Sequence, residues 1–253
     1  MDERELLSRT LASLRSSYAL GVKGAPDSRL LELDGLVASI VPATPERSVL
    51  NGVVYERVEA LEANLEEIAA AYEAAGVRAW TVWVPEADKR AVKLLESAGH
   101  VLDASPRAMA LELDSLGDPP GAEPEWSGEW DIQAAGLIND RAYGDPEGLW
   151  ASAMSGVPEG LAHLYLVRVD GEPASMVMVH DHEDDCVFWY AATVPEARGR
   201  GYVSALLHRA LSEARDRGCR TTTTEATAMG RPVYERIGYR DLGALHMYER
   251  RAS

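Results

Sequence analysis

The chain has 253 residues, 46% apolar and 26% charged, which is the composition of a soluble globular protein with room for one large domain or two ordinary ones. A formal net charge of −16 argues against a protein that is attracted over long range to nucleic acid or to an anionic membrane. It favours a cationic ligand, unless the charge serves solubility alone. No apolar run reaches the length of a membrane span, and the acidic start, MDERELLSRT, lacks signal-peptide features. We therefore expect a cytoplasmic protein, monomeric or homodimeric, without nucleic-acid or membrane partners.

The cysteines and histidines predict neither a disulfide framework nor a metal site. Cys186 and Cys219 lie in apolar or β-rich stretches and are typical of core residues in a reducing compartment. His180 and His182 would share one face of a strand, but no third ligand is evident nearby. We expect no metal.

The first half shows an alternation of strands and helices that end at glycines. The pattern predicts a strand over 50–55, a helix over 56–75 ended by Gly76, a strand over 78–84, and a helix over 88–97 ended by Gly99. Residues 118–125 then carry prolines and a glycine that no helix or ladder crosses easily. We expect one domain over 1–117, a linker over 118–125, and a second domain over 126–253.

The second half shows the same alternation of strands and helices, with more elements. Its predicted elements are a helix over 131–143, strands over 161–169, 174–180 and 186–194, a helix over 202–217, a strand over 221–224, a helix over 232–237 and a strand over 246–250. Asp170-Gly171 is a hairpin turn signal, and Gly218 and Gly238 end the two later helices. Antiparallel strands followed by helical crossovers predict an α/β fold with a mixed, α+β-like sheet.

The stretch 194–204, VPEARGRGYVS, carries the chemistry. A strand runs into a basic, glycine-bearing turn that opens a helix. Such a turn directs backbone N–H groups and the positive end of the helix dipole toward one point, which suits a pyrophosphate. Arg198 and Arg200 add positive charge there. An ordinary strand-to-helix turn is the alternative.

This stretch resembles the GNAT superfamily of acyl-CoA-dependent N-acyltransferases, whose motif is Arg or Gln, two residues, Gly, one residue, then Gly or Ala. Arg198 and Gly201 match, whereas Val203 departs from the small residue and would push the pyrophosphate outward, with Ser204 offering a hydroxyl instead. Residues 230–239, GRPVYERIGY, resemble the second motif of the family. The resemblance covers about residues 160–250.

The resemblance implies acetyl-CoA as co-substrate and Tyr234 as the general acid that protonates the departing thiolate; core packing is the alternative role for that ring. Thr227 falls where the family often has a CoA-contacting Asn. The resemblance implies coenzyme contacts at Ala192, Thr193, Val194, Arg198, Gly199, Arg200, Gly201, Tyr202, Val203, Ser204, Thr227 and Tyr234.

The base that deprotonates the amine is not selected by the resemblance. Asp185, Glu225 and His182 are candidates, and for each of them a solvated turn charge is the alternative. Trp189 and Tyr190 could line an acceptor pocket, although strand alternation would turn one of them into the core.

The first half can be laid over the second as a degenerate copy. Gly76 matches Gly218 and Gly99 matches Gly238, while counting back places Glu56 at Arg198, Glu59 at Gly201 and Leu95 at Tyr234. The resemblance is therefore to tandem GNAT proteins with an intact C-terminal domain. An unrelated α/β domain is the alternative. We expect the first half to complete a sheet, cover an edge or wall the acceptor site.

The sequence thus predicts a cytoplasmic N-acetyltransferase that moves an acetyl or small acyl group from acetyl-CoA to an amine by direct attack in a ternary complex. A non-catalytic GNAT module that binds acyl-CoA or a partner is the alternative. The acceptor is not identified by any motif.

Overall fold

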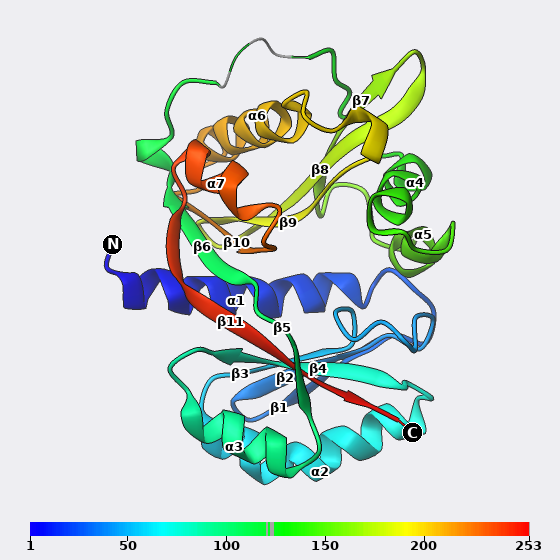
Figure 1. The fold of residues 1–253 in the computed structure, drawn as a ribbon, viewed down its shortest axis with the longest axis vertical. Helices are drawn as coiled ribbons and strands as arrows, with labels where there is room; N and C mark the ends of the chain where they lie inside the picture. Colours follow the sequence, from blue (N-terminus) through cyan, green and yellow to red (C-terminus); the bar gives the residue numbers. More distant parts are fainter. Residues whose placement is uncertain (120, 122–123, 253) are drawn as a thin grey trace.

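The computed structural model describes residues 1–119, 121 and 124–252 (Figure 1). Residues 120, 122 and 123 of the predicted linker lie outside the described residues, so the domain boundary there stays a prediction.

The first half contains the four predicted elements and several that the sequence pattern did not predict. Its helices are α1 (Glu3–Gly21), α2 (Val58–Ala74) and α3 (Lys89–Ser97); its strands are β1 (Arg29–Leu33), β2 (Leu36–Ile40), β3 (Gly52–Tyr55), β4 (Ala79–Pro85), β5 (Val101–Ala104) and β6 (Arg107–Glu112), followed by η1 (Leu113–Ser115). The additions are helix α1, the β1–β2 hairpin, strands β5 and β6, and η1.

The second half contains every predicted element. Its helices are α4 (Ile132–Tyr143), α5 (Leu149–Met154), η2 (Pro195–Ala197), α6 (Tyr202–Asp216) and α7 (Arg231–Ile237); its strands are β7 (His163–Val169), β8 (Glu172–His182), β9 (Asp185–Thr193), β10 (Thr221–Ala226) and β11 (Arg240–Arg251). The predicted hairpin turn is confirmed, because Asp170 and Gly171 have φ of 53° and 86°. Short helix α5 was not predicted.

The two halves repeat one strand pattern and exchange their last strands. In each half two antiparallel pairings are followed by a parallel pairing across a crossover helix, β3 to β4 across α2 and β9 to β10 across α6. The described strands form one 11-stranded sheet in the order β1-β2-β3-β4-β11-β6-β10-β9-β8-β7, with β5 beside β11. Strand β6 therefore pairs with β10 of the second half, and β11 pairs with β4 of the first. Figure 1 shows β11 descending from the upper half into the lower one.

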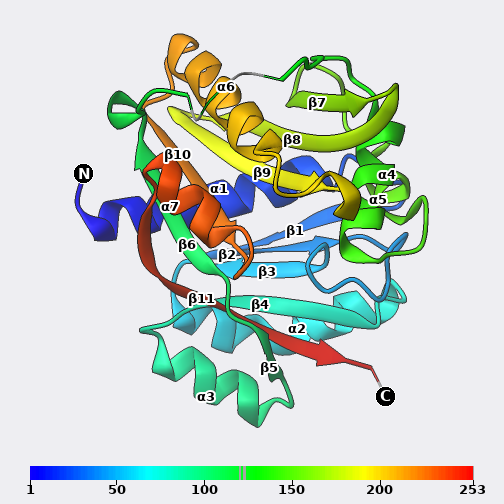
Figure 2. The same ribbon diagram turned by 45° about the horizontal axis from the view of Figure 1, so that its top comes forward.

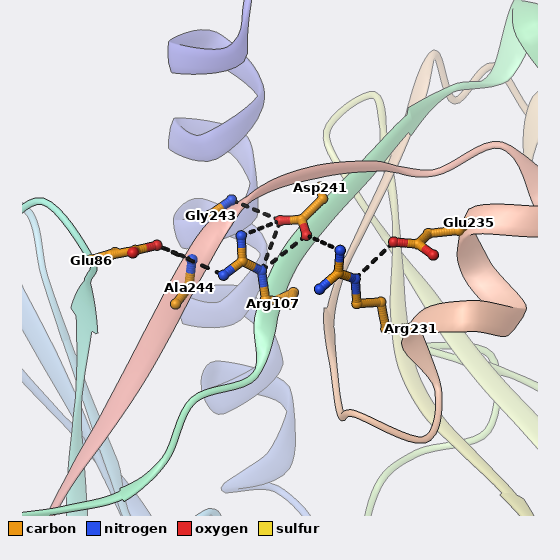
Figure 3. A network of polar contacts seen from close by, with 7 residues as sticks. All are labelled: Glu86, Arg107, Arg231, Glu235, Asp241, Gly243 and Ala244. Carbon is orange, nitrogen blue, oxygen red and sulfur yellow. Dashed lines mark hydrogen bonds and ion pairs between the residues drawn. The ribbon is translucent and has the colours of Figure 1, made fainter.

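Polar contacts fix the point where β11 passes between the halves (Figure 3). Arg107 of β6 donates from Nε to both carboxylate oxygens of Asp241, at 2.9 and 3.0 Å. The Ala244 N–H donates to Glu86 at 2.9 Å, and this bond together with Arg107 holds the pKa of Glu86 below its usual value. Between these contacts the pairing with β6 shifts register, and Gly243 takes a φ of 110° that favours glycine.

Helix α1 lies between the halves, as both ribbon views show (Figures 1 and 2). Leu14 and Tyr18 pack in one apolar cluster with Trp83, Ala108 and Met247, drawn from β4, β6 and β11. Ser13 on the same helix donates to the buried Asp185 at 2.7 Å. These contacts hold α1 against the start of β9, so that one face of the helix can line a site between the halves.

Candidate active site

The predicted coenzyme turn joins β9 to α6 through residues 194–201. Gly199 and Gly201 take φ of 77° and 78°, and Gly201 caps α6 without any side-chain hydrogen bond. The first-turn amides of the helix therefore lack a side-chain acceptor, which leaves the positive end of its dipole available to an anion. Arg198 does not project freely: it donates to the Thr193 carbonyl at 3.3 Å and to the Ala142 carbonyl at 2.8 Å.

The strands beside this turn separate from one another. Parallel pairing between β9 and β10 covers only residues 185–187 with 221–223, and beyond it Thr224 donates to the Phe188 carbonyl at 3.1 Å. Strand β9 carries a bulge in the same place, because Met178 pairs with Tyr190 whereas Val179 pairs with Phe188. The extra residue is Trp189. A gap at the carboxyl end of two parallel strands is where α/β sheets commonly bind ligands.

The bulge overturns the expectation that Trp189 and Tyr190 point to opposite faces. Both side chains line one cavity, and their rings lie 5.1 Å apart. The physical reason is that a bulge adds one residue to one strand, which breaks the period of two that alternation assumes. Neither ring is therefore lost to the opposite core.

The cavity measures about 620 Å³ and is built by both halves. The second half contributes the ends of α4, α5, β9 and β10, and the first half contributes α1, the loop after β2, β4 and the β5–β6 turn. Its wall consists of Leu14, Ser17, Tyr18, Gly21, Ser39, Val41, Arg47, Val49, Leu50, Trp83, Ala104, Ser105, Pro106, Asn139, Tyr143, Asp145, Leu149, Trp150, Ala153, Met154, Trp189, Tyr190, Glu225, Thr227, Ala228 and Met247. Residues 192–204, which include the coenzyme turn, do not line it, whereas β9, which leads into the turn, and β10 contribute Trp189, Tyr190 and Glu225.

Glu225 is the candidate base that faces this cavity. It lies on the same face of β10 as Thr221 and Thr223, which point toward α1 through their contacts with Asp185. Burial, followed by the nearby charge of Asp185, raises the pKa of Glu225 to about 8. A carboxyl group with this pKa is partly ionised near neutral pH and can both accept and return a proton.

The other two base candidates lie at the opposite end of β9. Asp185 accepts hydrogen bonds from Ser13, Thr221 and Thr223 at 2.6 to 2.7 Å, and burial raises its pKa although the three hydroxyls oppose the shift. His182 pairs with Asp185 at the β8–β9 turn. Neither side chain lines the cavity. In the described chain Asp185 connects α1, β9 and β10.

His180 occupies a structural position as well. Its ring is buried, lies 3.1 Å from the Ser17 hydroxyl and meets Trp189 edge-on with centroids 5.3 Å apart. Burial lowers its pKa to about 4, so the imidazole is neutral. Among the described residues no group of three or more His, Cys, Asp or Glu side chains could hold a metal ion.

Tyr234 lies on α7, packs against the apolar cluster under α6 and does not line the cavity. Its ring meets Phe188 of β9 edge-on, with centroids 5.0 Å apart. Burial, and then the neighbouring Tyr143, raises the pKa of Tyr234 above its usual value, so its hydroxyl keeps its proton at neutral pH. Tyr143 extends from the end of α4, and its hydroxyl donates to the Ala191 carbonyl at 3.5 Å. The two phenols thus flank the separated strands.

The remaining coenzyme candidates surround the same gap. Thr227 lines the cavity and accepts a hydrogen bond from the Gly230 N–H at 3.2 Å, so its hydroxyl is partly committed to starting α7. Val203 packs at the edge of the core under α6, and Ser204 lies half-buried in the first turn of that helix.

Several wall residues were missed by sequence reasoning. Tyr143, Asn139 and Trp150 come from α4 and α5, while Arg47 and Trp83 come from the first half. No motif marks them. Several of these residues are aromatic and lie near turns, but this pattern does not predict that the elements carrying them come together.

The first copy has no counterpart of the coenzyme turn. Strand β3 ends at Tyr55 and α2 begins at Val58, so two residues stand where the second copy has residues 194–201. Glu56 forms an ion pair with Arg15, and Glu59 forms one with Arg90. These carboxylates thus do not replace residues of an anion site: the loop that would hold the anion is absent.

Comparison with known proteins agrees with this fold. The structure is similar to a GCN5-related N-acetyltransferase from Kribbella flavida (16% identity, TM-score 0.70), and the match covers 96% of each chain. It is also similar to a tandem GNAT protein from the clavulanic acid biosynthesis pathway (13%, TM-score 0.62, 97% of this chain and 96% of that one). A functionally unknown conserved protein from Staphylococcus epidermidis matches as well (11%, TM-score 0.62, 90% and 95%).

These identities establish the fold alone, whereas a match to a family model goes further. No curated protein matches the sequence. The model of the acetyltransferase (GNAT) domain matches residues 86–223, more than half of the chain, and runs from the end of β4 through the coenzyme turn into β10. The chain therefore belongs to the GNAT acetyltransferase family.

Proposed function

We propose that this protein is an acetyl-CoA-dependent N-acetyltransferase, acting in the cytoplasm, that transfers an acetyl or other small acyl group to an amine in a ternary complex. The observation that carries the proposal is the position of Glu225. Its carboxyl group, with a pKa of about 8, faces a cavity lined by residues beyond the last pairing of β9 with β10, and β9 leads from there into the coenzyme turn.

The residues of the turn fit the proposed co-substrate. The uncapped start of α6 supplies amides for a pyrophosphate, and Arg200 adds an exposed positive charge. Arg198 keeps the turn in place by donating to carbonyls of β9 and α4. The backbone of residues 192–194, beyond the last pairing with β10, would pair with the pantetheine arm. We propose that Val203 allows only a looser approach of the phosphates than a glycine would.

The proposed reaction uses two proton carriers on opposite sides of the gap. The ionised carboxylate of Glu225 takes a proton from the ammonium group of the acceptor, and the neutral amine attacks the thioester carbonyl carbon to form the C–N bond. When the C–S bond breaks, Tyr234 donates its phenolic proton to the departing thiolate. The nitrogen releases its second proton, which restores Tyr234 through solvent, and Glu225 returns its own proton to solvent. The products are an amide and CoA.

The first half has a structural part in this proposal. The first half, through α1, the end of β2 and the loop after it, Trp83 and the β5–β6 turn, forms about half of the cavity wall, so the acceptor would bind between the two copies. Among the described residues no helix is long and apolar enough to span a membrane. We propose the domain limits 1–117 and 126–253 for the two copies.

An assay of thiol release from acetyl-CoA with a panel of amines tests the proposal. We expect amine-dependent release, and calorimetry should give one CoA per chain. Binding of CoA without release for any amine would leave a non-catalytic acyl-CoA-binding module. Two CoA sites, or one site retained by a chain whose Arg198 and Arg200 are both replaced by Glu, would refute the assignment of the turn.

A further inference from the structure

The cavity between the copies has a specific chemical character. Eight aromatic or sulfur-containing side chains form much of its wall: Tyr18, Trp83, Tyr143, Trp150, Met154, Trp189, Tyr190 and Met247. Trp150 meets Tyr190 edge-on with centroids 5.2 Å apart, so the rings form a connected surface. A wall of this kind gains free energy by burying an apolar group.

The charges in the wall are distributed unevenly. Arg47, Asp145 and Glu225 are the charged residues that line the cavity within the described chain. Arg47 and Asp145 form an ion pair with one another, from the loop after β2 to the α4–α5 loop. Glu225 forms no ion pair within the described chain. The titratable groups that interact with it electrostatically are Tyr18 on α1 and Asp185 on β9, neither of them a cation.

An unpaired carboxyl group in a partly buried wall is stabilised by an incoming cation. Ionisation of Glu225 in that environment is unfavourable until a positive group replaces the lost water. An ammonium group supplies this charge. An anionic group on the ligand would gain no such pairing, because the guanidinium of Arg47 in the wall already pairs with Asp145.

The serine hydroxyls of the wall are already engaged. Ser17 contacts His180, Ser39 donates to the Leu50 carbonyl at 2.9 Å, and Ser105 contacts His246 at 2.9 Å. Within the described chain the Asn139 amide, the Tyr190 hydroxyl and the buried indole N–H of Trp150 have no hydrogen-bond partner and remain available to a ligand. These few groups cannot satisfy every hydroxyl of a polyhydroxylated acceptor, and each unsatisfied hydroxyl costs free energy.

We propose that the acceptor is an aryl-bearing, largely apolar amine without an acidic group, and that its ammonium pairs with Glu225 while its ring lies among Trp83, Trp150 and Trp189. This inference rests on the proposed function for the role of the cavity. It excludes amino acids with a free carboxylate and amino sugars as preferred acceptors.

Binding of model amines to the CoA-saturated full-length protein tests this class without turnover. The probes are tryptamine, tryptophan, which adds a carboxylate, glucosamine, which is polyhydroxylated, and 3-methylindole, which lacks the amine. Calorimetry should give tryptamine at least 10-fold tighter binding than tryptophan or glucosamine. Glu225→Gln should weaken tryptamine about 10-fold or more and leave 3-methylindole within twofold.

A pair of matched tryptophan variants tests whether tryptamine binds in this cavity. Val49 lines the cavity and is 48% exposed, so Val49→Trp should narrow the opening and weaken tryptamine without disturbing the core. Val101 on β5 is 64% exposed and away from the cavity, so Val101→Trp should leave tryptamine affinity unchanged.

The outcomes separate the acceptor class from the reaction. Tight tryptamine binding without thiol release for any amine would uphold the acceptor class and reject the transferase. Thiol release with glucosamine or tryptophan in preference to tryptamine would uphold the transferase and overturn the class. Equal affinity for tryptamine, tryptophan and glucosamine would also overturn it.

Discussion

The two copies in this chain share a framework and differ where the coenzyme would bind. Gly76 and Gly218 end equivalent crossover helices with positive φ of 72° and 105°. The seventh residue after each glycine lines the cavity, and it is Trp83 in the first copy and Glu225 in the second. The first copy has lost the loop between strand and helix, whereas the second has kept it. The comparison teaches that one copy can supply the wall of a site whose proposed chemistry belongs to the other.

Replacing the charged member of this equivalent pair should have the largest effect. Glu225→Gln keeps the shape and removes the base, so we expect kcat/KM to fall about 10²–10⁴-fold at pH 8. In the wild type the rate should rise with pH through about 8, as Glu225 ionises, and this step should be absent from the variant. Steady-state kinetics over a pH series measures both.

Trp83→Phe is the matched control for that experiment. It keeps a ring in the wall and loses the Trp83 hydrogen bond to the Tyr18 hydroxyl at 2.6 Å. We expect a change in the acceptor KM with little change in kcat. A Glu225→Gln enzyme within threefold of wild type would mean that the two equivalent positions do not differ in chemical role.

The second comparison is between Tyr234 and Leu95, which follow equivalent strands. Tyr234→Phe retains the ring packed on Phe188 and removes the proton donor, so kcat should fall about 100-fold while the affinity for acetyl-CoA stays constant. Tyr143→Phe, on the other side of the gap, is the matched variant and should retain kcat. If Tyr143→Phe lowers kcat and Tyr234→Phe does not, the general acid is Tyr143.

The coenzyme turn is present in the second copy and has no counterpart in the first. Arg198→Glu removes two donors that hold the turn and places a negative charge beside the pyrophosphate, which should weaken CoA by about 2–4 kcal/mol, roughly 30-fold or more. In the first copy Glu56→Arg should create no CoA site, because the loop itself is missing. Calorimetry that found wild-type affinity for the first variant, or two sites for the second, would contradict this.

The smallest expected effect is on stability. The folded pKa of Glu225 is about 8, above the value of about 4.5 for an unfolded glutamate, so the folded state holds its proton longer. Below pH 4.5 both states are protonated; between pH 4.5 and 8 the wild type should lose stability as pH rises; above pH 8 the loss is constant. Relative to Glu225→Gln we expect a deficit of a few degrees in Tm at pH 8.5 and none at pH 4.5. Thermal unfolding at both values tests it.

Much of the second half could be predicted because its signals are local. Alternating apolar residues mark β7, a continuous apolar run marks β9, and a run of β-branched threonines marks β10. Gly218 and Gly238 mark helix ends at which their positive φ is required. The glycines of the coenzyme turn predict a tight turn in the same way, because they too need a positive φ. Glu225 was one of three base candidates, but its selection depends on which face of β10 meets α1, and that face is set by contacts distant in sequence.

The features that escaped prediction are those decided by distant partners. Helix α1 buries Thr10, Ser13 and Ser17, and such small polar residues weaken the apolar period; Ser13 is satisfied by Asp185 and Ser17 by His180. The bulge at Trp189 changes the register without any local glycine or proline. Strand exchange depends on whether β6 pairs better with β4 or with β10, and alternation alone does not rank these pairings.

The exchange of terminal strands has a consequence for biosynthesis. Strand β6 pairs with β10, and β4 pairs with β11, so each of these strands waits for a partner that is synthesised much later. Until β11 has been translated, neither half can close its sheet, and the nascent first half carries open strand edges. A nascent chain arrested before β11 would therefore display an aggregation-prone intermediate for chaperones to shield.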